Sequence, residues 1–90
     1  MDIEATTVLG RMVAAGRMLA GLDQGGLAAA AGVSASTISN VERGMDARED
    51  TIKSVRKALR RSGVTVSLDR LNGMAIAAIR FDEPDPDNDE

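Results

Sequence analysis

The sequence has 90 residues, enough for one domain and too few for two of ordinary size. It contains no cysteine and no histidine, which excludes disulfides and thiolate metal sites and removes the usual general base, so we expect neither an enzyme nor a bound cofactor. The net charge of −3 comes from six acids in the last nine residues, whereas residues 1–81 hold all 11 Lys and Arg against eight acids, a net charge of +3 that weakly indicates nucleic-acid contact.

The N-terminal segment MDIEATT is acidic and lacks the basic and apolar parts of a signal peptide. No apolar run in the sequence approaches the roughly 20 residues that a membrane span requires. We therefore expect a cytoplasmic protein without a membrane partner.

Apolar residues at helical spacing predict a first helix that begins at Thr6 or Thr7 and runs to about Ala20. Asp23 is a good N-cap for a second helix over residues 24–31, although two glycines in its first turn lower the helical propensity. The inward face of the first helix is formed by Leu9, Met12, Val13, Gly16 and either Leu19 or Ala20.

A tight turn and a third helix follow directly. Gly32 suits the left-handed position that ends a helix, and Ser34 can cap a third helix over residues 35–43. Ile38 and Val41 mark the inward face of this helix, so its remaining polar residues are predicted to face outward.

A fourth helix is predicted over residues 51–62, capped by Asp50 and ended by Gly63. Its inward face consists of Ile52, Val55, Ala58 and Leu59. Its basic residues Lys53, Arg56, Lys57 and Arg60 share another face, which is either a solvated surface or a site for phosphates or for the acidic segment.

The spacing of the apolar residues then changes from about 3.6 to 2, which predicts a strand from Val64 to about Asp69. Asn72-Gly73 is the strongest short hairpin signal, and residues 74–81 form the return strand. Because a two-stranded hairpin is marginal alone in water, it must pack on the helices or pair with a second copy. For a homodimer, the expected contact residues are Val64, Val66, Leu68, Met74, Ile76 and Ile79.

The final segment, DEPDPDNDE, is acidic and interrupted by two prolines, so we expect it to be disordered. The chain thus divides into a helical part over residues 1–63, a hairpin over residues 64–81 that is the expected dimerisation element, and an acidic tail over residues 82–90.

The second and third helices carry a specific motif. Gln24, Leu27-Ala28, the triplet GVS at 32–34, STIS at 36–39 and ERG at 42–44 resemble the helix-turn-helix of the Cro and phage-repressor type of regulators, the XRE family. Residues from about Val8 to Gly63 fit this family's mostly α, four- to five-helix fold, called lambda-repressor-like, and the hairpin resembles an extension found in small members. The resemblance implies that double-stranded DNA is the partner.

In this family, the positions matching Ala35, Ser36, Ser39 and Asn40 contact base edges in the major groove. Asn40 can pair with adenine N6 and N7, and Ala35 can touch a thymine methyl group. The alternative is a solvated face of short polar residues. None of the four positions holds Arg, Lys or Gln, so DNA shape and half-site spacing must contribute to specificity.

Contacts to the DNA backbone supply affinity rather than sequence discrimination. The resemblance implies such a contact for Gln24, and the other candidates are Ser34, Thr37, Arg43 and Arg48. For Ser34, a role as N-cap alone is at least as well supported. Arg17 and Glu42 match a pair that forms an internal salt bridge in relatives, so we expect them to be scaffold residues.

The leading hypothesis is a dimeric transcription repressor that occupies a palindromic operator. The alternative is an antitoxin or another protein-interaction module, in which the acidic tail or the last strand binds a partner protein. A neighbouring toxin gene would favour this alternative.

Overall fold

The computed structural model describes residues 5–46 and 48–82, which form four helices followed by one antiparallel hairpin. The elements are α1 (Ala5–Leu19), α2 (Gln24–Ala31), α3 (Ala35–Glu42), α4 (Glu49–Arg61), β1 (Val64–Leu71) and β2 (Met74–Phe81). The mostly helical fold with a C-terminal hairpin is the one expected from the sequence. No helix in these ranges is long and apolar enough to cross a membrane.

The predicted helix boundaries were wrong at two N-termini. Helix α1 begins at Ala5, so Thr6 and Thr7 lie in its first turn rather than at a cap. Helix α4 begins at Glu49, and its N-cap is Arg48, which makes no side-chain capping bond. Asp50 therefore lies inside the first turn, where a carboxylate is favourable beside the positive end of the helix dipole.

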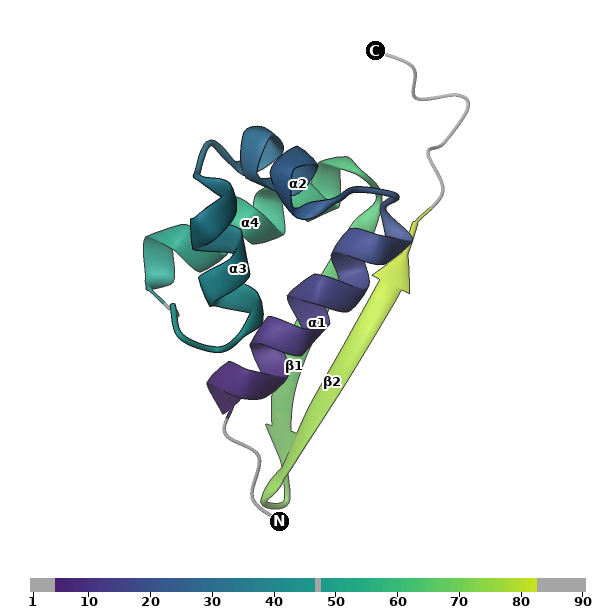
Figure 1. The fold of residues 1–90 in the computed structure, drawn as a ribbon. Helices are drawn as coiled ribbons and strands as arrows, with labels where there is room; N and C mark the ends of the chain where they lie inside the picture. Colours follow the sequence, from purple (N-terminus) through teal and green to yellow (C-terminus); the bar gives the residue numbers. More distant parts are fainter. Residues whose placement is uncertain (1–4, 47, 83–90) are drawn as a thin grey trace.

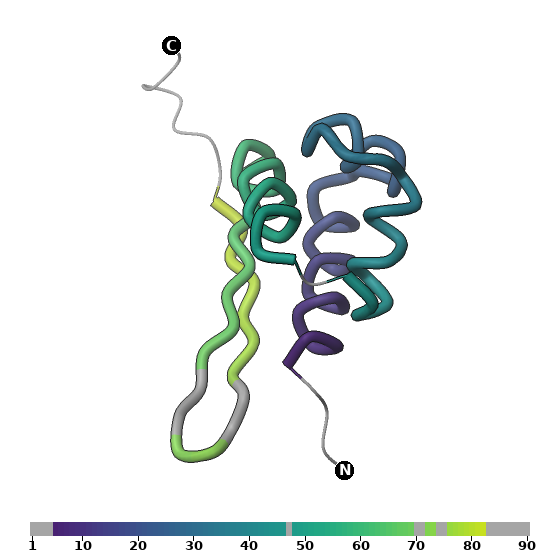
Figure 2. Tube along the Cα trace, turned by 90° about the vertical axis from the view of Figure 1, so that its left-hand side faces the viewer, coloured from purple at the N-terminus to yellow at the C-terminus, as the bar shows by residue number. Residues whose placement is uncertain are grey.

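The elements form three layers (Figures 1 and 2). The hairpin lies on one side, α2 and α3 lie on the other, and α1 and α4 lie between them. The core between these layers contains Val13, Leu27, Ala28, Ile38, Val41, Val55, Ala58, Leu59, Val64 and Val66. Because β1 contributes two of these side chains, the hairpin completes the core of the helical part.

Two glycines in α1 allow this layered packing. A Cβ atom on Gly10 would lie 2.8 Å from the backbone oxygen of Glu42, and it would lie even closer to that of Val41. A Cβ atom on Gly16 would lie 3.1 Å from the Cγ1 atom of Val66. Helix α1 therefore approaches α3 with one side and the hairpin with another, at distances that a larger side chain would not permit.

The hairpin has the turn that its sequence predicts. Asn72 and Gly73 have φ angles of 54° and 79°, as a two-residue type I′ turn requires. The register pairs Leu71 with Met74 at the turn and Val64 with Phe81 at the other end. Beyond it, the Asp82 amide donates to the Gly63 carbonyl at 2.6 Å, which closes the open end of the ladder.

Candidate nucleic-acid interface

The turn between α2 and α3 is built as the sequence predicts. The Asp23 carboxylate accepts a hydrogen bond from the Gly26 amide at 2.6 Å and so caps α2. Gly32 ends this helix with φ 72°, and the Val33 amide donates to the Ala28 carbonyl at 3.0 Å. These local bonds fix the point at which the chain turns from α2 into α3.

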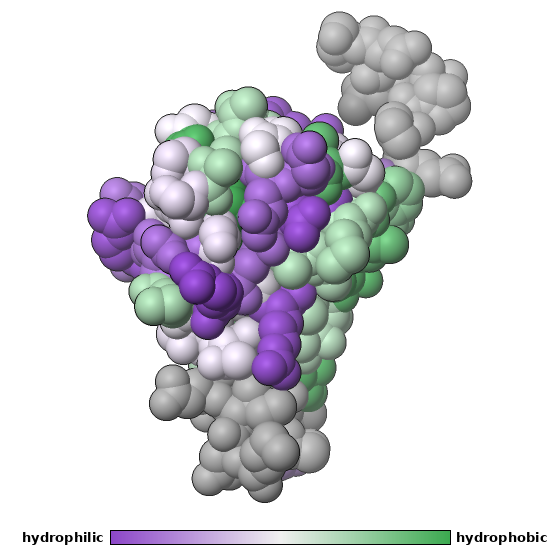
Figure 3. Space-filling view, viewed as in Figure 1, coloured by the Kyte–Doolittle hydropathy of each residue, from purple (hydrophilic) through white to green (hydrophobic). Residues whose placement is uncertain are grey.

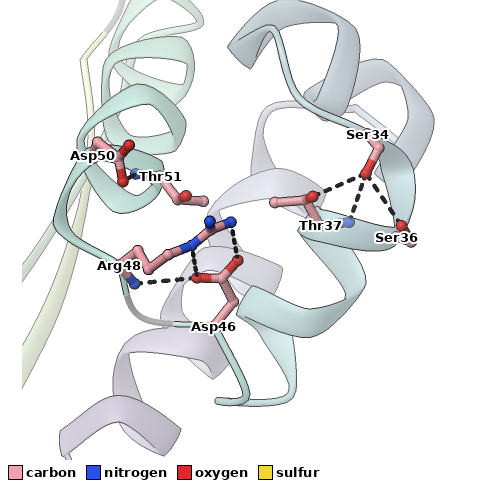
Figure 4. A network of polar contacts seen from close by, with 7 residues as sticks. All are labelled: Ser34, Ser36, Thr37, Asp46, Arg48, Asp50 and Thr51. Carbon is pink, nitrogen blue, oxygen red and sulfur yellow. Dashed lines mark hydrogen bonds and ion pairs between the residues drawn. The ribbon is translucent and has the colours of Figure 1, made fainter.

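Ser34 is the centre of a hydroxyl cluster at the first turn of α3 (Figure 4). Its Oγ atom accepts a hydrogen bond from the Thr37 amide at 3.1 Å, which confirms Ser34 as the N-cap. The same Oγ atom lies 2.9 Å from the Thr37 hydroxyl and 3.1 Å from the Ser36 hydroxyl. Hydroxyls that exchange donor and acceptor roles in this way can also bond to a phosphate or a base edge.

The structure brings the four predicted base-contact residues to the outward side of α3. Ala35 and Ser36 are exposed and Ser39 and Asn40 are half-buried, while Ile38 on the same helix is completely buried. The helix is therefore held by its apolar side, and its first two turns present short side chains that allow close approach to another surface.

Arg43 has a contact within α3 that the sequence did not indicate. It is the C-cap residue of α3, and its guanidinium donates to the Asn40 Oδ1 atom at 2.8 Å. This bond fixes the amide group of Asn40, yet Oδ1 keeps a second lone pair and Nδ2 keeps its donors. Arg43 thus orients Asn40 and still offers further donors to a phosphate.

Arg48 is bound to an acid that we did not single out from the sequence. Its guanidinium forms an ion pair with Asp46 at 3.1 Å, and its amide also donates to the Asp46 carboxylate (Figure 4). These hydrogen bonds from Arg48 lower the pKa of Asp46, and the pair raises the pKa of Arg48. Because the Arg48 side chain is largely exposed, a DNA phosphate can replace this partner.

A second ion pair, between α1 and the last residue of α3, holds α3 in place. The Arg17 Nε atom donates to the Glu42 carboxylate at 2.7 Å, which confirms the predicted salt bridge, and this bond raises the pKa of Arg17. Arg17 also donates to the Leu22 carbonyl at 3.1 Å, so it joins α1 to the segment before α2. Glu42 is the last residue of α3, so the pair also fixes the end of that helix.

Gln24 joins the Arg17–Glu42 ion pair to form a cluster of three side chains, which the sequence did not indicate. Its Nε2 atom donates to the Glu42 Oε1 atom at 3.0 Å. The other hydrogen on this nitrogen remains a donor, and Gln24 is the first residue of α2, where backbone amides are also unpaired. The predicted phosphate contact is therefore compatible with the internal bond.

Two basic residues of α4 donate to backbone carbonyls of other elements. Arg56 donates to the Val66 carbonyl at 2.8 Å, and Arg61 donates to the Ala30 carbonyl at the end of α2. Arg56 therefore has a structural role in addition to its charge, which the helical spacing alone did not reveal.

In the comparison with protein families, residues 13–66 match the model described as helix-turn-helix. This range includes α2, α3, all of α4 and the beginning of β1. The comparison with curated proteins finds no match.

Proposed function

Because the chain belongs to the helix-turn-helix family of DNA-binding transcription regulators of the Cro and phage-repressor type, we propose that it is a dimeric repressor that occupies a palindromic operator. The observation that carries this proposal is the outward side of α3, with its short polar side chains on a rigid helix. Repression by occupancy requires DNA binding alone, so it needs no ligand or catalytic group.

The base contacts are assigned to Ala35, Ser36, Ser39 and Asn40, and the phosphate contacts to Gln24, Ser34, Thr37, Arg43 and Arg48. Asn40 is the strongest candidate for base recognition because an amide can pair with adenine at two atoms. Its bond to Arg43 supports this role, since a fixed amide loses less conformational freedom on binding.

We expect the double variant Ser36→Ala/Asn40→Ala to lose most of its preference for the operator. One good bidentate contact contributes about 1–3 kcal/mol of discrimination, so affinity should fall roughly 5- to 150-fold. Fluorescence anisotropy with the selected operator and with a random duplex would measure this effect. Binding to the random duplex should change little, and unchanged binding to the operator would refute the assignment.

The operator itself is found by selecting bound duplexes from a random pool and measuring the mass of the complex. The proposal predicts a palindrome whose half-sites lie about 34–36 Å apart, with two chains per duplex. The absence of any selected sequence at moderate salt would contradict sequence-specific binding.

For the dimer, the free edge of β2 is the supported contact. Along the ladder from Leu71–Met74 to Gly63–Asp82, every second pair of opposite residues is hydrogen-bonded between the strands. Val66 and Ala77 belong to the other pairs, so their backbone N–H and C=O groups point away from the partner strand. Arg56 occupies the Val66 carbonyl on the outer edge of β1. The outer edge of β2 has no such cap among the hydrogen bonds of the described residues.

The surface of β2 also favours association. Apolar residues gather along this strand at the right of Figure 3, and Ile76 and Phe81, on opposite faces of the hairpin, are 42% and 54% exposed. An exposed apolar strand edge is a template for pairing with another chain. A second copy of β2 would satisfy the backbone groups of both strands.

This contact differs from the one expected from the sequence. Val64 and Val66 lie in the core of their own chain, and Ile79 packs against that core, so these side chains are already occupied. Leu68 is half-buried on the same face of the hairpin, and Ile76 lies on the opposite face. The side chain of Met74 lies outside the described part of the structure.

We expect Ala77→Pro to weaken the dimer and leave the monomer folded. Proline removes the Ala77 amide, which points to the free edge and makes no bond within the hairpin. Sedimentation velocity should show dimers of the unaltered chain and monomers of the variant at the same concentration, with similar circular dichroism spectra. An unaltered chain that stays monomeric with and without operator would instead favour the alternative, in which the β2 edge binds a different protein.

A further inference from the structure

An open groove of about 760 Å³ runs along α4 beside Leu9 of α1. It is lined by Leu9, Glu49, Ile52, Lys53, Arg56 and Arg60. Two of these residues are apolar, three are cationic and one is acidic, so the groove combines an apolar surface with a net positive charge. None of these residues belongs to the DNA contacts assigned above.

We propose that this groove binds the acidic segment 83–90 of the same chain. That segment carries five carboxylates at Glu83, Asp85, Asp87, Asp89 and Glu90, and no cation. Its two prolines, Pro84 and Pro86, carry apolar rings that suit the Leu9 and Ile52 surface and favour an extended backbone. The charge and the shape of the segment thus both complement the groove.

The position at which the segment leaves the fold supports binding in the same chain. Asp82 is held beside Gly63 by the backbone hydrogen bond described above, and Gly63 follows the C-terminal end of α4. A smaller hollow lined by Arg56, Arg60, Thr65 and Val66 shares two arginines with the groove and extends it toward that end.

The length of the segment is sufficient. Eight residues span up to about 26–29 Å when extended. Helix α4 has 13 residues and is therefore about 20 Å long. The segment can pass Arg60 and Arg56 and reach Lys53, while Glu49 lies beyond these cations at the start of the helix and repels the carboxylates there.

The interaction is ionic and exposed, so salt must weaken it. The screening length is about 10 Å at 0.1 M salt and about 3 Å at 1 M. At low salt the docked segment would neutralise the three cations of the groove and so lower the attraction of this face for anionic partners. At high salt the segment would leave the groove.

The chain contains two lysines, Lys53 and Lys57, and this makes a direct test possible. Both are exposed on α4, but Lys53 lines the groove and Lys57 does not. A zero-length carbodiimide reagent joins a carboxylate to an amine only when the two are in contact. Applied to the full chain at low salt, it should link carboxylates of 83–90 to Lys53 several-fold more than to Lys57, as measured by peptide mass spectrometry.

Three further results are required. The links should disappear at 1 M salt, and Arg60→Gln should reduce them whereas Arg11→Gln, an exposed change on α1 outside the groove, should not. In a mixture of ¹⁵N-labelled and unlabelled chains, the linked peptides should carry a single label. Equal linking of both lysines, no linking of 83–90, or links between labelled and unlabelled chains would overturn the proposal, and none of these outcomes depends on DNA binding.

Discussion

Replacing Glu42 with Ala is expected to lower the free energy of unfolding by about 3–5 kcal/mol. Glu42 accepts hydrogen bonds from Arg17 and Gln24, and its loss leaves the Arg17 guanidinium without its anion in a site where only 16% of the side chain is exposed. Removing one partner of a buried pair is costly because the other charge remains away from water. Urea unfolding followed by circular dichroism would measure the loss.

The matched control is Arg80→Gln, which breaks the Arg80–Asp82 ion pair. The Arg80 side chain is 72% exposed, and such surface pairs contribute no more than about 1 kcal/mol. A second variant, with both Arg17 and Glu42 replaced by Met, should recover part of the stability because no unpaired charge is left. If Glu42→Ala cost no more than Arg80→Gln, the cluster would not support the interface as described.

The second large effect is expected for Gly10→Ala, which should lower the free energy of unfolding by roughly 1–3 kcal/mol. The added methyl group would overlap the backbone oxygens of Val41 and Glu42, and backbone atoms at a helix end cannot rotate away as a side chain can. Helices α1 and α3 would have to separate, and the contact between α1 and the end of α3 would weaken.

The control for this prediction is the same substitution at a different glycine. The nearest atom to a Cβ on Gly25 is the Asp23 Oδ1 atom at 3.7 Å, an ordinary contact. Gly25→Ala should therefore stabilise the protein, by up to about 1 kcal/mol, because Ala is the better helix former. Thermal unfolding of the two variants in parallel should give shifts of opposite sign, and equal shifts would contradict the close approach at Gly10.

The parts of the fold that depend on neighbouring residues were predictable from the sequence. Asp23, Gly32, Ser34 and the Asn72-Gly73 turn each act over three or four positions, so their residue types predict their roles. The same local signals failed at Asp50, because an acid is favourable both at the cap and within the first turn of a helix.

The interactions that depend on tertiary geometry were not predictable in the same way. Nothing in the spacing of α1 indicates that Gly10 meets the end of α3 while Gly16 meets β1. The bond from Gln24 to Glu42 joins residues 18 positions apart, and Arg56 meets a backbone carbonyl rather than a charge. The outward residues of α3 were predictable because the helical period of about 3.6 residues places them on the side opposite Ile38 and Val41.

The placement of Val64 and Val66 in the core has a consequence for how such chains change in evolution. The hairpin that would join two copies is not a separate element on a flexible linker, because the first residues of β1 pack between α1 and α4. If the hairpin were replaced by that of a relative, the new hairpin would need valines at the positions of Val64 and Val66. Position 16 would have to remain glycine, because a Cβ atom there would lie against these valines. A change in the way two copies associate would therefore require matching changes in the core of the helical part, so the two are expected to evolve together.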